Sequence, residues 1–342
     1  MRPLLHLMNT PENIFAQAYE YISLISLGMV ANVFYNLFSS YLRAVGNSRM
    51  PLVFLVLSAC LNVVLDLILI INFKMGVAGA AWATNLSQAI SAVLCAVYIY
   101  KKVPALMPEK RHWRFHKGDT RYQLATGIPM ALQFAITSSG TMVMQSAINL
   151  FGSEAVAAYT AAGKIHGLLT QGMVAMGQTM AVYSGQNYGK GDAGRIRQGV
   201  RAALIIEVIY SVASAVVVSA ALGPSLGLFF SGEVDLAAMM PWARTYTTIC
   251  ILFYVPLCTI FIFRNTMQGC GYGFLPMMGG VVELAARLIV AVIAMDIHSY
   301  WLACACDPAA WVGAGLFTGI SYLYIIKKIE KNLGKGTAVH KS

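Results

Sequence analysis

Apolar and polar residues alternate along the chain in long blocks. Nine apolar runs approach or exceed the length of about 20 residues with which a helix crosses a bilayer. Tilt, kinks or extension beyond the hydrocarbon can absorb the extra length of the longer runs. The runs cover residues 21–42, 51–73, 77–100, 124–151, 155–183, 202–230, 236–263, 274–295 and 299–326. This pattern predicts an all-α integral membrane protein with nine transmembrane helices.

The composition agrees with this prediction. Of 342 residues, 58% are hydrophobic and only 11% are charged, whereas soluble domains are about 25% charged. A disordered chain and a nucleic-acid-binding protein are therefore excluded, and the lipid bilayer is the expected surrounding. The seven cysteines are scattered and mostly lie inside apolar stretches, which fits neither a disulfide framework nor a zinc site. We expect no metal and no cofactor.

Basic residues gather in alternate loops, which predicts an orientation. Lysines and arginines accumulate on the cytoplasmic side of short loops. One set of alternate loops holds 19 of the 24 basic residues, including Arg264, and the other set holds only Arg2 and Lys74. We therefore expect the C-terminus in the cytoplasm, the N-terminus outside and a location in the cell inner membrane. The basic stretch 101–123 is the expected cytoplasmic linker between two halves.

The first and last thirds of the chain share a weak internal repeat. A shift of 225 residues aligns Gly46 with Gly271 and Pro51 with Pro276. The pattern Gly-Ala-x3-Thr-x2-Ser also occurs twice, beginning at Gly79 and at Gly313. The first three spans would then match the last three in the same orientation, as in transporters built from parallel repeats. Chance similarity between apolar helices is the alternative. A complete first repeat would need three further spans upstream.

Several ordered motifs resemble one family of transporters. They are Leu42-Arg43-Ala44-Val45-Gly46-Asn47-Ser48-Arg49-Met50-Pro51, Asn62-x3-Asp66, Gly76-Val77-Ala78-Gly79-Ala80, Gly127-Ile128-Pro129 and Gln186-Asn187-Tyr188-Gly189-Lys190-Gly191-Asp192. In this order they make the chain similar to multidrug and toxic compound extrusion (MATE) transporters of the DinF-like and NorM-like bacterial type. The resemblance covers essentially the whole chain.

The resemblance implies a fold with twelve spans in two six-span lobes around a central substrate cavity. Its first three spans would lack a counterpart here, so the nine helices correspond to spans four to twelve. Residues 1–100 would form the second half of the N-terminal lobe, and 101–123 the linker. Residues 124–327 would form the C-terminal lobe, and 328–342 a cytoplasmic tail.

The implied function is secondary active efflux. A monomeric antiporter would export amphipathic, often cationic small molecules in exchange for Na⁺ or H⁺. The alternatives are a truncated, inactive remnant of such a transporter and a lipid-linked oligosaccharide flippase, whose cavity would need more basic residues. An enzyme is not expected, because no HExxH motif occurs.

Ionisable side chains inside the predicted spans are candidates for function, because burying charge in a bilayer is costly. Glu283 and Arg287 lie four residues apart and can pair along one helical face. They form either a structural pair or part of a substrate or proton pathway. Lys164, in the fifth run, has the same two interpretations.

The remaining candidates are polar residues one turn apart. Asn62 and Asp66 share a helical face, and a partly desolvated Asp66 could exchange protons. Helix packing is the alternative explanation for both. Gln133, Gln145 and Asn149 of the fourth run could line a cavity or form hydrogen bonds between helices.

Overall fold

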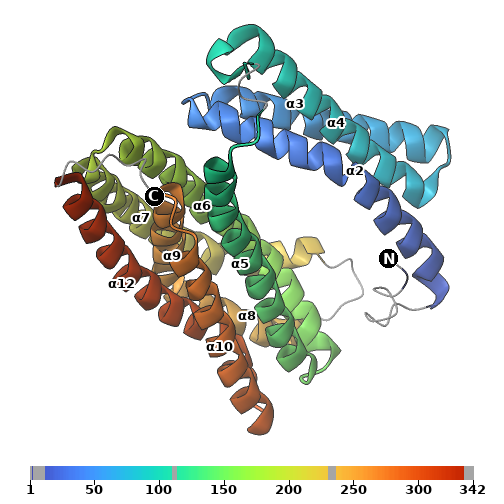
Figure 1. Ribbon diagram of the computed structural model, residues 1–342. Helices are drawn as coiled ribbons and strands as arrows, with labels where there is room; N and C mark the ends of the chain where they lie inside the picture. Colours follow the sequence, from blue (N-terminus) through green and yellow to red (C-terminus); the bar gives the residue numbers. More distant parts are fainter. Residues whose placement is uncertain (1, 3–11, 110–113, 230–235, 335–342) are drawn as a thin grey trace. The chain divides into compact units, whose positions relative to one another are not determined.

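The computed structural model describes residues 2, 12–109, 114–229 and 236–334, and in these ranges the chain is helical, with no strand (Figure 1). The chain divides into two compact units, Met1–Phe115 and His116–Ser342. The boundary between the units falls inside the basic stretch 101–123. Each unit is described separately.

The first unit contains three long helices. They are α2 (Glu12–Ala44), α3 (Arg49–Asp66), which continues into the π-helical turn η1 (Leu67–Asn72), and α4 (Gly76–Lys102), followed by the short 3₁₀ helix η2 (Pro104–Leu106). α4 packs against both α2 and α3. Small residues allow this close approach: a Cβ added at Gly28 of α2 would lie 1.8 Å from Oδ1 of Asn85. The Asn85 amide donates to the carbonyl of Leu24 at 2.7 Å and so ties α4 to α2.

The described residues of the second unit form eight helices. They are α5 (Lys117–Asn149), α6 (Ser153–Lys190), α7 (Ala193–Phe229), α8 (Leu236–Leu252), α9 (Tyr254–Gly269), α10 (Phe274–Asp296), α11 (Tyr300–Cys304) and α12 (Cys306–Gly334). α10 packs between α5 and α12, while α6 packs against α7, α8 and α9.

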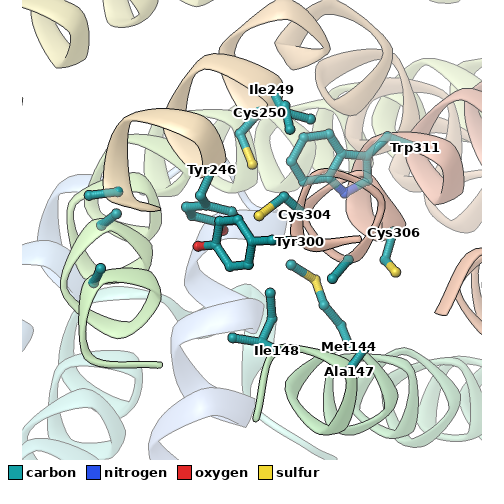
Figure 2. Packing of buried hydrophobic residues seen from close by; sticks show 14 of the residues in the cluster. Met144, Ala147, Ile148, Tyr246, Ile249, Cys250, Tyr300, Cys304, Cys306 and Trp311 are labelled. Carbon is teal, nitrogen blue, oxygen red and sulfur yellow. The ribbon is translucent and has the colours of Figure 1, made fainter. Parts of the chain in front are cut away.

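A buried cluster joins α5, α8, α11 and α12. Tyr246 and Cys250 of α8 face Cys304 of α11, and Met144 of α5 lies beside them (Figure 2). All seven cysteines are free thiols. The cysteines of this cluster therefore act as small apolar groups that allow close helix packing.

The predicted seventh run is broken rather than continuous. α8 and α9 meet at Phe253 with a bend of 51°. Pro256, three residues after the break, has no backbone N–H to donate to the carbonyl of Leu252, so the helical ladder is interrupted there. The last predicted run is also divided, because α11 precedes α12.

The described residues of all nine predicted runs lie mostly in helices, and Phe230, the last residue of the sixth run, lies outside the described residues. The predicted count of nine spans is not confirmed. Six helical segments are long and apolar enough to cross a membrane, and α8 with α9 would make a seventh if the bent pair is one span. α5 and α6 are long but carry many serines, threonines, glycines and glutamines. These residues lower the mean hydropathy of both helices.

The internal repeat is present in the backbone of the two units. α2 ends at Ala44 and α3 begins at Arg49, and α9 ends at Gly269 and α10 begins at Phe274, each pair 225 residues apart. Both turns contain a glycine with φ of 83°, namely Gly46 and Gly271.

The hydrogen bonds of these two turns also match. The Gly46 N–H donates to the Arg43 carbonyl at 3.0 Å, and the Gly271 N–H donates to the Gln268 carbonyl at 2.9 Å. In the later pattern, the Thr84 hydroxyl donates to the Ala80 carbonyl at 3.0 Å, as the Thr318 hydroxyl does to that of Ala314 at 2.7 Å.

The two turn glycines provide a matched test of backbone strain and packing. A left-handed φ costs a residue with a Cβ about 1–2 kcal/mol. A Cβ at Gly46 would meet nothing within 4 Å, whereas one at Gly271 would lie 2.0 Å from the Tyr122 hydroxyl. We expect Gly46→Ala to lower the free energy of unfolding by about 1 kcal/mol and Gly271→Ala to lower it clearly more. Thermal unfolding in detergent would measure both, and equal losses would contradict this account of the α9–α10 turn.

Candidate functional site

A chain of four alternating charges lies inside the second unit. Glu283 of α10 accepts a hydrogen bond from Arg264 of α9 and lies 3.5 Å from Nη1 of Arg287, one turn further along α10. Arg287 Nε donates to Oδ1 of Asp307 of α12 at 2.8 Å. Three helices are therefore joined by side chains whose formal charges sum to zero. We call these four residues the ion-pair network.

The ion-pair network is almost completely shielded from the exterior. The side chains of Arg264, Glu283 and Arg287 are 8%, 5% and 4% exposed, and that of Asp307 is 13% exposed. Transferring such charges out of water is expensive, and breaking a buried pair by removing one partner costs about 3–5 kcal/mol. Removing any one member would therefore leave another with an uncompensated buried charge.

Glycines on two helices make room for the arginines. A Cβ added at Gly140 of α5 would lie 2.9 Å from Nη1 of Arg287, and one at Gly279 of α10 would lie 3.8 Å from Nη2 of Arg264 and 2.9 Å from Thr318 Cγ2. α5 and α10 also approach at Gly280, where a Cβ would lie 3.2 Å from Cγ of Gln133. The close approach of α5 to α10 thus closes one side of the network.

A group of aromatic residues lies at the bend between α8 and α9. His166 Nδ1 of α6 is hydrogen-bonded to the Tyr254 hydroxyl at 2.9 Å, and its ring stacks on Trp311 of α12 at 5.6 Å. Tyr246 of α8 contacts the His166 ring edge-on at 6.2 Å. Tyr254 is the first residue of α9, so this group holds the bend against α6 and α12.

The structure brings together only some of the candidates named from the sequence. Glu283 and Arg287 are paired, as the spacing predicts. Gln133 is 4% exposed and accepts a hydrogen bond from the Gln268 amide of α9 at 2.8 Å. This bond joins α5 to α9.

The other second-unit candidates lie outside the network. The Gln145 amide donates to Oδ1 of Asn149 at 2.9 Å on a solvent-accessible part of α5. Lys164 lies on an exposed face of α6.

In the first unit, the amide of Asn62 lies 3.5 Å from the Thr84 hydroxyl, at the outer limit of a hydrogen bond. Asp66 is half-buried at the junction of α3 with the π-helical turn. Its Oδ1 atom is buried and makes no hydrogen bond with the described residues. Such π-helical turns often occur at functional positions.

Sequence analysis missed two members of the network. Arg264 was assigned to a cytoplasmic loop, but α9 continues to Gly269 and buries it. Asp307 follows the Cys304-Ala305-Cys306 stretch and has no charged partner at helical spacing. The one feature of the sequence that pointed to these two residues was the Glu283–Arg287 pair, because a buried charged pair needs further hydrogen-bond partners.

The repeat places neutral residues where the network has charges. Positions 225 residues before Arg264, Glu283 and Arg287 are occupied by Ser39, Ser58 and Asn62. Ser39 and Ser58 are 1% and 4% exposed. The two units therefore share a helical framework, and only the second carries this set of charges.

Helices of membrane-spanning length, a repeat in one orientation and buried charge are typical of membrane transporters. The sequence model of the MatE family matches residues 1–68 and 129–293. The chain therefore belongs to the MatE family, the multidrug and toxic compound extrusion transporters.

Similar proteins carry names from the same family. The chain is 33% identical over 195 residues to the probable multidrug resistance protein YpnP of Bacillus subtilis, covering 56% of this chain and 43% of that protein. It is 25% identical over 317 residues to the probable multidrug resistance protein NorM of Thermotoga maritima, covering 89% and 65%. The chain thus spans less than two thirds of the length of these relatives.

Solved structures show the same fold. A crystal structure of MATE in the bent conformation has a TM-score of 0.88 at 20% identity, with 97% of this chain and 74% of that chain covered. An outward-facing multidrug resistance MATE family transporter has a TM-score of 0.83 at 21% identity, with 97% and 74% covered.

The ion-pair network can be tested against a surface pair of similar geometry. Arg197 Nε lies 2.8 Å from Oε1 of Glu330, but these side chains are 41% and 39% exposed. We expect Glu283→Gln to lower the free energy of unfolding by about 3–5 kcal/mol, because two buried arginines lose their shared partner. Glu330→Gln should cost at most about 1 kcal/mol. Thermal unfolding in detergent would compare them, and similar losses would refute a stabilising role for the network.

Proposed function

We propose that the chain acts in secondary active efflux, exporting amphipathic and often cationic small molecules in exchange for Na⁺ or H⁺. The observation that carries this proposal is the family match, which extends over both units, at residues 1–68 and 129–293. The names of relatives support it, because YpnP and NorM are described as probable multidrug resistance proteins.

We also propose how the units correspond to the lobes of such a transporter. Residues 1–100 would be the second half of the N-terminal lobe, 101–123 a cytoplasmic linker, 124–327 the C-terminal lobe and 328–342 a tail. The asymmetry of basic residues supports a cytoplasmic C-terminus and an outer N-terminus for nine spans. The proposed unit of function is a monomer.

Transport itself can be measured with the chain as it stands. In proteoliposomes that contain the 342-residue chain, we expect ethidium to move against its concentration gradient when an opposing proton or Na⁺ gradient is imposed. Protein-free liposomes and ionophores that collapse each gradient are the controls. Ethidium movement that is unchanged by both ionophores, or no movement above the protein-free level, would contradict the proposal.

The carboxylates inside the helices suggest which residues exchange the coupling ion. Glu283 and Asp307 are paired with arginines, so their formal charges are already compensated. Asp66 and Glu207 each have a buried carboxylate oxygen that makes no hydrogen bond with the described residues. An unpaired buried carboxylate is stabilised by taking up a cation or a proton. We therefore propose Asp66 and Glu207, one in each unit, as the coupling residues.

Neutral variants test this assignment. We expect Asp66→Asn or Glu207→Gln to lower gradient-driven ethidium efflux at least about tenfold, since neither amide can exchange a proton. Glu154→Gln, on an exposed first turn of α6, is the matched control and should keep full efflux. The proton and Na⁺ gradients are imposed separately, which identifies the ion. Full efflux by both coupling variants under each gradient would refute the assignment.

A further inference from the structure

A second charged feature lies apart from the ion-pair network, at the start of the bent pair of helices. A cavity of about 690 Å³ lies between α8 and Trp301 of α11. Its α8 wall comes from residues spaced three and four apart, so a single face of the helix lines it. These residues are Ala237, Met240, Pro241, Arg244, Thr245, Thr248 and Ile249.

Arg244 differs from the other arginines of these helices. Arg264 and Arg287 are buried and bonded to carboxylates, whereas Arg244 is exposed to the cavity and has no hydrogen bond or ion pair with the residues described. It lies eight residues after Leu236, which is about 12 Å along α8. A guanidinium on an apolar helix is costly unless it faces water or an anionic group.

The rest of the cavity has a definite chemistry. Thr245 and Thr248 supply hydroxyl groups beside Arg244, Trp301 supplies an indole ring, and the other lining residues are apolar. None of the residues that line it is acidic. A guanidinium binds a carboxylate through two parallel hydrogen bonds, and an indole packs on an aromatic ring.

The residue next to Trp301 in α11 is bonded to α8. Tyr300, next to Trp301, donates from its hydroxyl to the Trp242 carbonyl of α8 at 3.2 Å, and the rings of Tyr300 and Trp242 meet edge-on at 4.6 Å. α11 is therefore held against α8. This contact sets the distance between the α8 and α11 backbones that carry Arg244 and Trp301, and the Trp301 side chain itself is 58% exposed.

The geometry points to a binding site for aromatic carboxylates, in which Arg244 holds the carboxylate and Trp301 contacts the ring. This inference rests on the proposed efflux function and extends its substrates beyond cations to amphipathic molecules that carry an acidic group. The site uses none of the residues of the ion-pair network, and neither Asp66 nor Glu207.

Equilibrium binding tests the site without depending on transport. The probes are 2-naphthoate and 2-naphthamide, which have the same ring and differ in charge, and the 342-residue chain is held in nanodiscs, with protein-free nanodiscs subtracted. We expect the chain to bind the carboxylate at least about tenfold more tightly than the amide. Arg244→Gln should remove this preference, and Arg244→Lys, which keeps the charge without the guanidinium, should retain part of it.

Two further variants separate charge from ring contact. Arg195→Gln, on an exposed position of α7, should keep the full preference, while Trp301→Ala should weaken both probes by a similar factor. Equal binding of the two probes by the unaltered chain would overturn the inference. So would an undiminished preference in Arg244→Gln or a lost one in Arg195→Gln. Failure of ethidium efflux with the binding preference intact would overturn the proposed function and support the site.

Discussion

Neutralisation of buried charge is the constraint on which the second unit depends. Arg264, Glu283, Arg287 and Asp307 alternate in sign, so that no member is left with an uncompensated charge in a medium where solvation is lost. Because the four residues come from α9, α10 and α12, neutralising the charges also fixes which helices are neighbours. In a bilayer, apolar packing alone discriminates little between possible neighbouring helices. The network supplies that selectivity.

Comparing matching positions in the two units shows which features belong to the shared helical framework and which belong to the buried charges. Both units use the same left-handed glycine between consecutive helices and the same threonine bond within the following helix. At the positions of three network charges, however, the first unit has Ser39, Ser58 and Asn62. These side chains can be buried at a much lower desolvation cost than ions. The framework therefore tolerates either chemistry, and the charges are a property of the second unit alone.

Local pattern in the sequence was sufficient for the helices and for contacts within one helix. The apolar runs predicted the helical segments, and the spacing of four residues predicted the Glu283–Arg287 pair. Arg264 and Asp307 lie 19 and 20 residues from their partners, so their contacts arise from packing between helices and have no periodic signature. The position of the break at Phe253 could not be predicted for a related reason. A proline near a helix start indicates a possible interruption, but neighbouring helices determine whether the chain bends there.

Charged groups in these helices thus fall into two sets with different physical roles. The paired set is electrically neutral and tightly enclosed, and any change in its protonation or position would leave a charge without a partner. It is suited to holding α9, α10 and α12 together. The unpaired set, Asp66, Glu207 and Arg244, has unused capacity to bind an ion, a proton or an acidic group. A transporter needs both, because coupling requires groups whose charge state can change while the surrounding helices keep their packing. On this argument we propose that the network serves as a scaffold and that the unpaired groups exchange ions and substrates.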